Sequence, residues 1–292
     1  MSLVAGVELG GTKIVCTLAS GPGDIVAQET VPTIAPDETL GACHAILSRW
    51  HEEHGFGALG IASFGPIDLD RSSPTYGHMT NTAKQRWIGA DIAGVLSRGF
   101  DVPVAFDTDV NGAATAEMRW GAGQGLSDLA YVTVGTGVGV GLIVNGQSTR
   151  GIQHSELGHL RIARMAGDDW AGACPYHGDC VEGLASGSAI VARLGDVDVA
   201  TVGPQDPIWD TVVHAIAQLC HNMVVTTGPL RILIGGGVIQ RQPHLLPRIE
   251  PKLVESLAGY MPLPKDQPYV TAPGLGDLAG PLGPIAMALS AG

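Results

Sequence analysis

The sequence predicts an α/β protein with two lobes, and three observations support this prediction. Short apolar runs of strand type alternate with longer segments of helical periodicity along the whole chain. The 292 residues, 45% of them hydrophobic, suffice for a large core divided over two domains of moderate size. A strand, a glycine turn and a second strand occur near the N-terminus and again near residue 135. The repeat indicates that the two halves share one plan.

The first half is expected to open with a hairpin and to continue with a helix, for which Asp37 or Thr39 is available as the N-terminal cap. We expect these residues to form the first lobe, 1–115, with a C-terminal helix at about 280–292 packing back on it. The predicted elements are strands at 5–9, 14–19 and 25–31, a helix at 40–54, a strand at 58–62, an irregular stretch at 64–87, a helix at 92–98, a strand at 102–106 and a helix at 110–120.

The second half, residues 116–279, is expected to repeat the theme. Its uncharged stretch 129–149 is long enough to resemble a membrane span, but glycines interrupt it and its residues alternate as in strands. A buried hairpin with a glycine turn is therefore predicted there, and the hairpin dipeptide Asn145-Gly146 follows its second strand. The predicted elements are strands at 129–134 and 140–144, a helix at 208–226, a strand at 232–234, a helix at 244–257 and an apolar closing segment at 284–291.

The charge and the cysteines restrict the classes of function. A formal net charge of −12 and the absence of a Lys/Arg run disfavour a nucleic acid or an anionic membrane as partner. The N-terminal residues show no secretion signal. Cys16, Cys43 and Cys220 fall in apolar stretches, where a free thiol behaves as a small core residue. We therefore expect a cytoplasmic metabolic protein with reduced thiols.

One cluster of residues has the spacing of a metal site. Cys174, His177 and Cys180 lie close together, and His159 lies a short distance upstream. Two thiolates and two imidazoles can surround one tetrahedral zinc ion, and four protein ligands leave no open position for water or substrate. A structural Zn²⁺ is predicted, against the alternatives of a small disulfide loop and incidental histidines.

The two glycine turns are candidate phosphate sites. Gly10-Gly11-Thr12 and Gly135-Thr136-Gly137 offer exposed N–H groups and a threonine hydroxyl. Both turns join two strands, so neither a Rossmann fingerprint nor a P-loop fits. Either turn alone is more often a simple chain reversal, but the matched pair favours phosphate binding. A duplicated lobe of this kind resembles the two-lobed actin-like ATPase (ribonuclease H-like) fold, whose active site lies in the cleft between the lobes.

The chain also resembles the ROK group of sugar kinases and repressors, especially its bacterial fructokinase branch. The resemblance covers most of the chain in the family's order. It rests on Glu8-Leu9-Gly10-Gly11-Thr12-Lys13, Gly65-Pro66-Ile67-Asp68, Asp107-Thr108-Asp109-Val110-Asn111-Gly112-Ala113-Ala114, Gly135-Thr136-Gly137-Val138-Gly139, Glu156-Leu157-Gly158-His159 and Cys174-Pro175-Tyr176-His177-Gly178-Asp179-Cys180-Val181-Glu182-Gly183.

The resemblance implies roles for single residues. Asp109 aligns with the catalytic base, with helix capping as the alternative. Glu8 would stand near the Mg²⁺-phosphate centre, or else complete a buried hairpin. Thr108 stands where many members have Asn, which puts one sugar hydrogen bond in doubt. The residues implied at the sugar are Gly65, Thr108, Asn111, Glu156, His159 and Glu182. Gly235, Gly236 and Gly237 match an adenosine-contacting turn, or form only a tight loop.

The implied activity is transfer of the γ-phosphoryl group of ATP to a hexose, with Mg²⁺ as cofactor. Fructose, giving fructose 6-phosphate, is the leading substrate and mannose the second, and a homodimer is expected. Asn81, Lys84 and Trp87 lie in a stretch that approaches the sugar in relatives, with roles left open. The alternatives are a glucokinase or N-acylmannosamine kinase, a sugar-binding module and a zinc-stabilised interaction protein. A sugar-sensing repressor is disfavoured because the chain starts at its first strand, without a helix-turn-helix domain.

Overall fold

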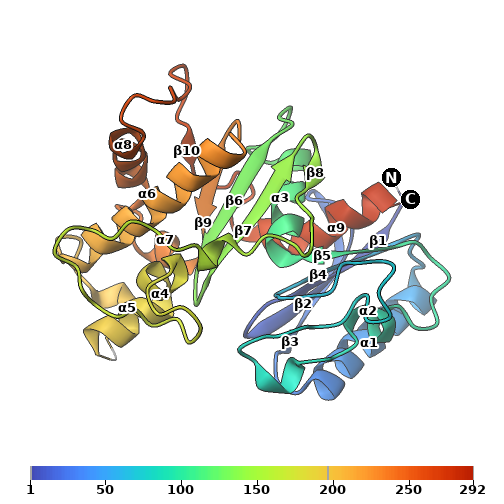
Figure 1. The fold of residues 1–292 in the computed structure, drawn as a ribbon. Coiled ribbons are helices and arrows are strands. Elements are labelled where there is room, and N and C mark those ends of the chain that lie inside the picture. The colour runs from blue at the N-terminus through green and yellow to red at the C-terminus, as the bar shows by residue number, and fades with distance from the viewer. Residues whose placement is uncertain (1, 196, 292) are drawn as a thin grey trace. The chain divides into compact units, whose positions relative to one another are not determined.

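The computed structural model describes residues 2–195 and 197–291, which form two compact units (Figure 1). The first unit comprises Met1–Gly125, Ser148–Ser155 and Gly274–Gly292, and the second comprises Leu126–Gln147 and Glu156–Pro273. This grouping assigns residues 116–125, 148–155 and 274–279 to the first unit, whereas the predicted lobes place them in the second. Each unit contains a five-stranded sheet.

The sheet of the first unit combines an antiparallel and a parallel half, in the order β3-β2-β1-β4-β5. Strand β1 pairs antiparallel with β2, which pairs with β3, whereas β1, β4 and β5 run parallel. The carboxyl ends of parallel strands meet at one edge of a sheet, so the residues after β1, β4 and β5 lie along the same edge. The strands are β1 (Val4–Leu9), β2 (Lys13–Gly21), β3 (Asp24–Pro32), β4 (Leu59–Ser63) and β5 (Val104–Thr108).

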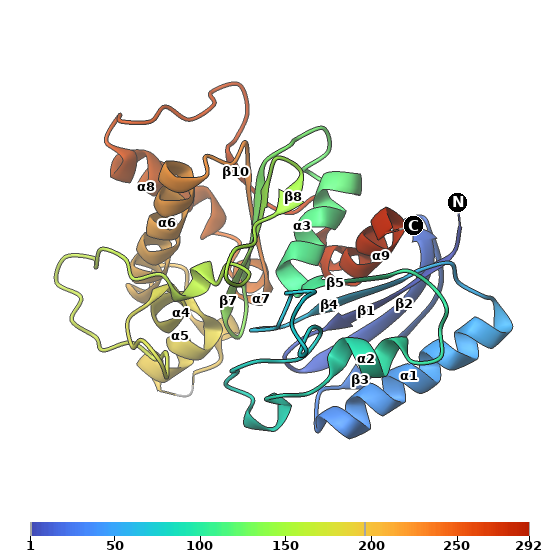
Figure 2. The same cartoon turned by 45° about the vertical axis from the view of Figure 1, so that its right-hand side comes forward.

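Helices cover both faces of this sheet (Figure 2). Apolar residues of α1 (Pro36–Glu53) and α2 (Ile92–Ser97) pack on one face. On the other, α9 (Ala279–Ala291) lies against the sheet and against α3 (Asp109–Trp120). The approach of α9 is very close: a Cβ at Gly60 would lie 1.8 Å from the Pro284 carbonyl oxygen. Glycine in β4 thus lets α9 pack directly on the backbone of the strand.

The start of α1 corrects a prediction. The helix begins at Pro36, four residues before the predicted start, so Asp37 and Thr39 lie inside it and neither is the cap. Residue 35 precedes the helix without a side-chain cap, and the Thr39 hydroxyl accepts a hydrogen bond from the Ile34 N–H at 3.1 Å. Proline at the first helical position needs no partner for a backbone N–H, which explains the earlier start.

The second unit has the strand order β10-β9-β6-β7-β8. The predicted hairpin is confirmed, because β6 and β7 pair antiparallel through six residue pairs. Asn145 and Gly146 both have positive φ, 52° and 74°, as a tight hairpin turn requires. Over the described residues, no helix is long and apolar enough to span a membrane. The strands are β6 (Leu129–Val134), β7 (Val138–Val144), β8 (Gln147–Ser148), β9 (Ile232–Gly235) and β10 (Val270–Thr271).

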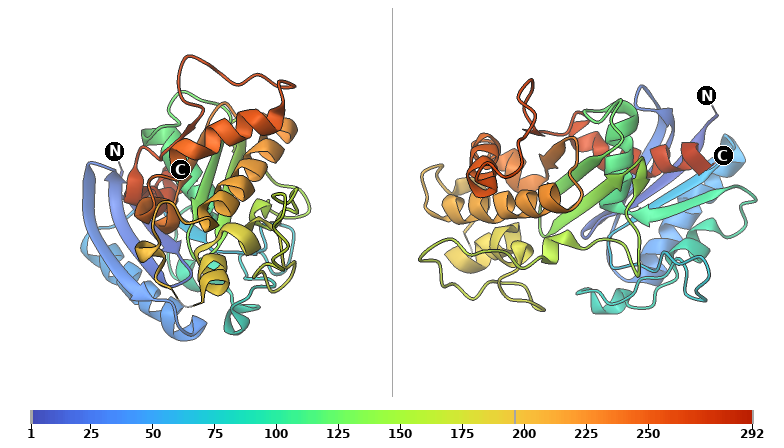
Figure 3. Two further views of the ribbon diagram at one scale, coloured as in Figure 1. Left: turned by 90° about the vertical axis from the view of Figure 1, so that its left-hand side faces the viewer. Right: turned by 45° about the horizontal axis from the view of Figure 1, so that its top comes forward.

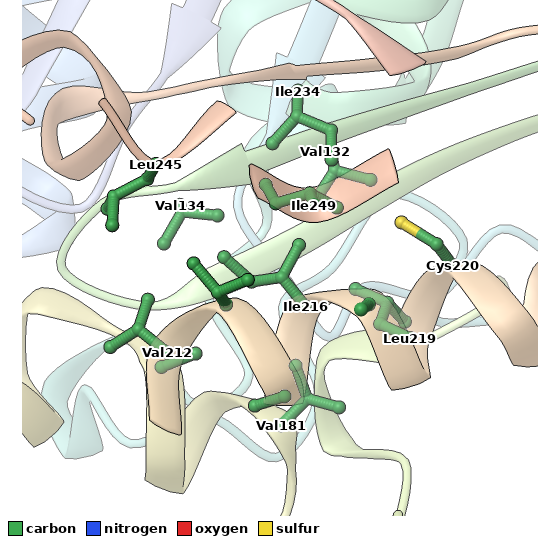
Figure 4. Packing of buried hydrophobic residues seen from close by; sticks show 14 of the residues in the cluster. Val132, Val134, Val181, Val212, Ile216, Leu219, Cys220, Ile234, Leu245 and Ile249 are labelled. Atoms are coloured by element: carbon green, nitrogen blue, oxygen red, sulfur yellow. The ribbon is translucent and has the colours of Figure 1, made fainter. Parts of the chain in front are cut away.

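The core of the second unit lies between this sheet and its helices. Helix α6 (Ile208–Thr226) has the predicted bounds and lies beside α8 (Leu246–Leu257), which starts two residues later than predicted (Figure 3). Apolar side chains from β6, β9, α6, α8 and α4 (Val181–Ala185) meet in one cluster (Figure 4). The remaining short helices are α5 (Gly187–Leu194) and α7 (Gly237–Arg241), with 3-10 turns at Gln85–Trp87, Leu157–His159, Val199–Thr201 and Gly276–Leu278.

Candidate active site

Asp109 lies at the carboxyl edge of the first sheet, as the first residue of α3. The cap of that helix is Thr108, whose hydroxyl accepts a hydrogen bond from the Asn111 N–H at 3.2 Å. The alternative that Asp109 serves as the N-terminal cap is therefore wrong. One Asp109 oxygen accepts a hydrogen bond from the adjacent Val110 N–H at 2.9 Å, and no described side chain donates to this carboxylate. Its carboxylate remains available to a ligand.

The surroundings of this edge raise the pKa values of its two carboxyl groups. Burial raises the pKa of Asp109 to about 6. Burial also raises the pKa of Glu8 to about 7, with a further contribution from the negative charge of Asp109, while the Lys13 ammonium opposes the increase. A divalent cation bound between these two partly buried carboxylates would relieve their mutual repulsion. Mg²⁺ is suited to this position because it prefers oxygen ligands.

The position of Glu8 depends on a glycine that the sequence did not single out. A Cβ at Gly280, in the first turn of α9, would lie 2.1 Å from Glu8 Oε1. The carboxylate therefore packs directly against the backbone of that turn. Any other residue at 280 would displace it.

The first glycine turn presents donors to solvent. The Gly10 N–H closes the turn onto the Lys13 carbonyl at 3.0 Å, and the Thr33 hydroxyl donates to the Gly10 carbonyl at 2.9 Å. Gly11 and Thr12 are exposed, and their N–H groups have no acceptor within the described residues. A fixed turn with two outward N–H groups is suited to phosphate oxygens.

The buried carboxylate of Asp107, for which the sequence predicted no role, accepts hydrogen bonds from several residues. Asp107 Oδ1 accepts from the amide of Asn111 at 2.8 Å, and Oδ2 accepts from the Ser148 hydroxyl at 2.8 Å and from Arg150 at 2.9 Å. Thr108 and Asn111, both expected at the sugar, are 4% and 2% exposed. Their polar groups take part in this network and in the helix cap.

Gly65 lies near the start of the irregular stretch after β4. The buried His154 holds this stretch in place through a hydrogen bond. His154 Nε2 accepts a hydrogen bond from the Ile67 N–H at 3.1 Å. Burial lowers the pKa of His154, which agrees with a neutral ring that accepts at this nitrogen. Ser148, Arg150 and His154 thus join residues 148–155 to the first unit.

Trp87, Asn81 and Lys84, the residues of the irregular stretch 64–87 whose roles were left open, lie in different surroundings. Trp87 is 1% exposed and its indole N–H donates to the Ile34 carbonyl at 2.9 Å, so it belongs to the core. Asn81 is exposed. Lys84 lies over the first glycine turn, where a Cβ at Gly11 would be 3.7 Å from its Cε.

The second unit brings the predicted metal ligands together. The ligand atoms of His159, Cys174, His177 and Cys180 lie within 4.8 Å of one another. Cys174 Sγ lies 3.6 Å from Nδ1 of both histidines, and Cys180 Sγ lies 3.7 Å from His159 Nδ1. Zinc bonds of about 2.3 Å to sulfur and about 2.1 Å to nitrogen, at tetrahedral angles, place sulfur and nitrogen about 3.6 Å apart. The donor set therefore fits zinc, and both thiols are free rather than joined in a disulfide.

Ion pairs hold the loop that carries these ligands. Asp179, between His177 and Cys180, pairs with Arg164 at 3.0 Å. Arg164 also pairs with Asp168 at 3.2 Å, and Asp168 pairs with Arg193 at 2.8 Å. The Asp168 side chain is only 2% exposed, so this network is largely shielded from water.

Glu182 connects the metal cluster to the second glycine turn. Its Oε1 lies 3.9 Å from His159 Nε2, and its Oε2 accepts a hydrogen bond from the Val138 N–H at 3.0 Å. A Cβ at Gly137 would lie 2.5 Å from that same oxygen. Glu156 is exposed, and its carbonyl accepts from the His159 N–H at 3.0 Å.

The remaining glycines close turns at the ends of β6 and β9. The Gly135 N–H donates to the Gly137 carbonyl at 2.9 Å, and the Gly187 N–H donates to the Gly135 carbonyl at 2.7 Å, while Thr136 stands between the two glycines. Gly236 has φ 92°, and a Cβ there would lie 2.6 Å from the Val134 backbone. Because of this φ and this close contact, packing alone already requires glycine at 236. Gly235 and Gly237 flank it at the entry to α7.

Another depression in the second unit contains none of the predicted residues. It lies between α8 and residues 259–271, and its lining is mainly apolar, with Val254 and Met261 among its residues.

Comparison with known proteins agrees with this geometry. The sequence matches the ROK family over residues 4–291. It is 37% identical to the fructokinase of Pediococcus pentosaceus, covering 99% of this chain and 98% of that protein, and 38% identical to the fructokinase of Zymomonas mobilis, covering 98% and 96%. The structure of a ROK family glucokinase from Streptomyces griseus in complex with glucose and AMPPNP aligns with a TM-score of 0.74 at 26% identity, over 99% of both chains. This likeness confirms the predicted fold class. The chain therefore belongs to the ROK family.

Proposed function

We propose that this protein is an ATP-dependent sugar kinase that phosphorylates D-fructose to fructose 6-phosphate. The observation that carries the proposal is Asp109: a carboxylate to which no side chain of the described residues donates, near Glu8 and on the same sheet edge as the exposed glycine turn. The choice of fructose rests on the relatives, because the two fructokinases are 37% and 38% identical and the glucokinase only 26%. Mannose is the second substrate.

Asp109 has the properties of a general base for this reaction. Its pKa of about 6 leaves it ionised at neutral pH, yet makes it more basic than an ordinary aspartate. The sugar hydroxyl would pass its proton to this carboxylate as its oxygen attacks the γ-phosphorus. The Val110 N–H holds the other side of the carboxylate in place.

Charge on the phosphates would be neutralised by the surroundings of Asp109. Glu8 would hold Mg²⁺, directly or through water, and Mg²⁺ supplies charge neutralisation at the phosphate oxygens when bound. The N–H groups of Gly11 and Thr12 would donate to the phosphate oxygens, as would the turn at Gly135, Thr136 and Gly137. Gly235, Gly236 and Gly237 would contact the adenosine.

At the sugar, carboxylates would accept hydrogen bonds from the hydroxyl groups. Gly65, Thr108 and Asn111 would line the sugar site or support the residues that line it. Glu182, Glu156 and His159 are the proposed partners. Zinc would be structural: with His159 Nδ1 on the metal, Nε2 still faces Glu182. The homodimer and the cytoplasmic location are proposed on the family resemblance alone.

The test is an ADP-release assay with Mg-ATP across fructose, mannose, glucose and N-acetylmannosamine. Asp109→Asn is compared with Asp37→Asn, an exposed aspartate in the first turn of α1. We expect fructose-dependent turnover that only Asp109→Asn loses. Turnover on glucose or N-acetylmannosamine alone would replace the proposed substrate by those of the alternative kinases. Silence on every sugar, with sugar binding retained, would favour a non-catalytic sugar-binding protein.

A further inference from the structure

Lys84 lies beside the first glycine turn, 73 positions away in the sequence. A Cβ at Gly11 would be 3.7 Å from Lys84 Cε, so the end of the lysine side chain lies close to the part of the turn that carries the exposed N–H groups. A cation and two outward N–H donors are thus collected at one place. This is the donor set of a site for a phosphoryl group.

The backbone of Lys84 is fixed on both sides. Its N–H donates to the Thr82 hydroxyl at 3.4 Å, and its carbonyl accepts from the Trp87 N–H at 2.8 Å. Trp87 in turn is 1% exposed and belongs to the apolar core of the first unit. The position from which the side chain departs is therefore set by buried contacts.

An aromatic ring supports the side chain. The Lys84 ammonium lies 6.0 Å from the centre of the Phe64 ring, within cation–π distance. Phe64 packs edge-on against Trp87 at 5.4 Å, and its N–H donates to the Leu9 carbonyl at 2.9 Å, just before the turn. Phe64 thus belongs to the same edge as the glycine turn and holds the lysine above it.

The ammonium has no carboxylate partner within the part of the chain that the structure describes. By contrast, Lys252 pairs with Glu255 and Lys13 acts on Glu8. In a chain with 28 acidic and 16 basic residues, an unpaired lysine beside two free N–H donors leaves a positive site for an anion.

We propose that Lys84 binds the phosphoryl group that is transferred, as a catalytic residue of the proposed reaction. The inference rests on the proposed kinase activity. The sugar oxygen forms its bond to the γ-phosphorus, the bond from that phosphorus to the β–γ bridging oxygen breaks, and the electron pair stays on ADP. The hydroxyl proton goes to Asp109. Lys84 exchanges no proton and stabilises charge on the γ-phosphoryl oxygens throughout.

The variants are Lys84→Met, which keeps length without charge, and Lys84→Arg, which keeps the charge. Lys252→Met, on α8, is the matched control. We expect Lys84→Met to lower kcat with fructose about 100-fold. It is also expected to weaken AMPPNP binding at least about tenfold more than ADP binding, measured by titration calorimetry with Mg²⁺. Lys84→Arg should retain most of the activity, and Lys252→Met should match the parent protein.

The nucleotide measurements separate this proposal from the proposed substrate. A parent protein that binds AMPPNP but phosphorylates no sugar would overturn the kinase proposal. The role of Lys84 would still be tested, by comparing the affinities of the parent and Lys84→Met proteins for AMPPNP and for ADP. A Lys84→Met protein that melts normally and keeps kcat within about twofold, or that weakens ADP and AMPPNP equally, would overturn the role of Lys84. A parent protein that binds neither nucleotide would overturn both.

Discussion

Replacing Glu8 by glutamine is expected to stabilise the protein above neutral pH while it impairs catalysis. Burial and the charge of Asp109 raise the pKa of Glu8 from 4.5 to about 7. The folded state therefore binds the Glu8 proton more tightly than the unfolded state does, so ionisation of Glu8 opposes folding. This penalty is absent below about pH 4.5, grows through the interval up to pH 7 and is complete above it.

The size of the penalty follows from the shift of about 2.5 pKa units. At about 1.36 kcal/mol per unit, the upper bound is roughly 3.4 kcal/mol. Glu8 is not fully buried, so we expect Glu8→Gln to raise the free energy of unfolding by about 2 kcal/mol at pH 8. At pH 4 the two proteins should be equally stable, because Glu8 is then neutral in both states.

The assay is urea denaturation followed by tryptophan fluorescence at pH 4 and pH 8, without Mg²⁺ or nucleotide. Glu52→Gln, exposed on α1, is the control. The same Glu8→Gln protein should show a large loss of kcat, since it lacks the proposed metal ligand. A variant that is less stable than the parent at pH 8, or that gains equally at both pH values, would refute the electrostatic account.

Three further predictions concern the base, the metal and the contact beneath Glu8. With Asp109 as base, kcat/KM should fall about tenfold per pH unit below about pH 6, because the protonated carboxyl cannot accept a proton. Asp109→Asn should lower kcat at least about 100-fold at pH 8. A pH-independent rate would contradict this role. Purified protein should contain about one zinc per chain, and Cys180→Ser should lose it together with several degrees of melting temperature; metal-free protein of normal stability would refute the zinc site. Gly280→Ala, although favourable for helix propensity by about 1 kcal/mol, should lower kcat because its methyl group would displace Glu8; unchanged kcat would show that the carboxylate adapts.

Local patterns were sufficient for much of the fold. The alternation in 129–144 predicted the β6–β7 hairpin of the second unit, Asn145-Gly146 predicted the turn after β7, and the apolar spacing of 208–226 predicted α6 with its bounds. The four metal ligands were recognisable because three of them lie within seven residues of one another. Such features depend on neighbours in the sequence, which a pattern records directly.

The parts that the sequence did not predict depend on contacts between distant residues. Asp107 and Arg150 are 43 positions apart, and their ion pair joins residues 148–155 to the first unit. The contact of Gly280 with Glu8 joins the two ends of the chain, and Trp87 proved to be a core residue through its burial among side chains from other segments of the first unit. No periodicity or spacing encodes which of these partners meet.

The double engagement of Glu182 restricts how sugar preference could be altered by engineering. One oxygen of this carboxylate holds the Val138 N–H of the second glycine turn, and the other faces His159 of the metal cluster. With Glu182 at the sugar as proposed, a substitution there made to accommodate another hexose should also disturb the second glycine turn and the loop of the candidate metal ligands. Glu156 is exposed, so within the proposed sugar site a library aimed at new sugars is better directed to position 156 and its neighbours.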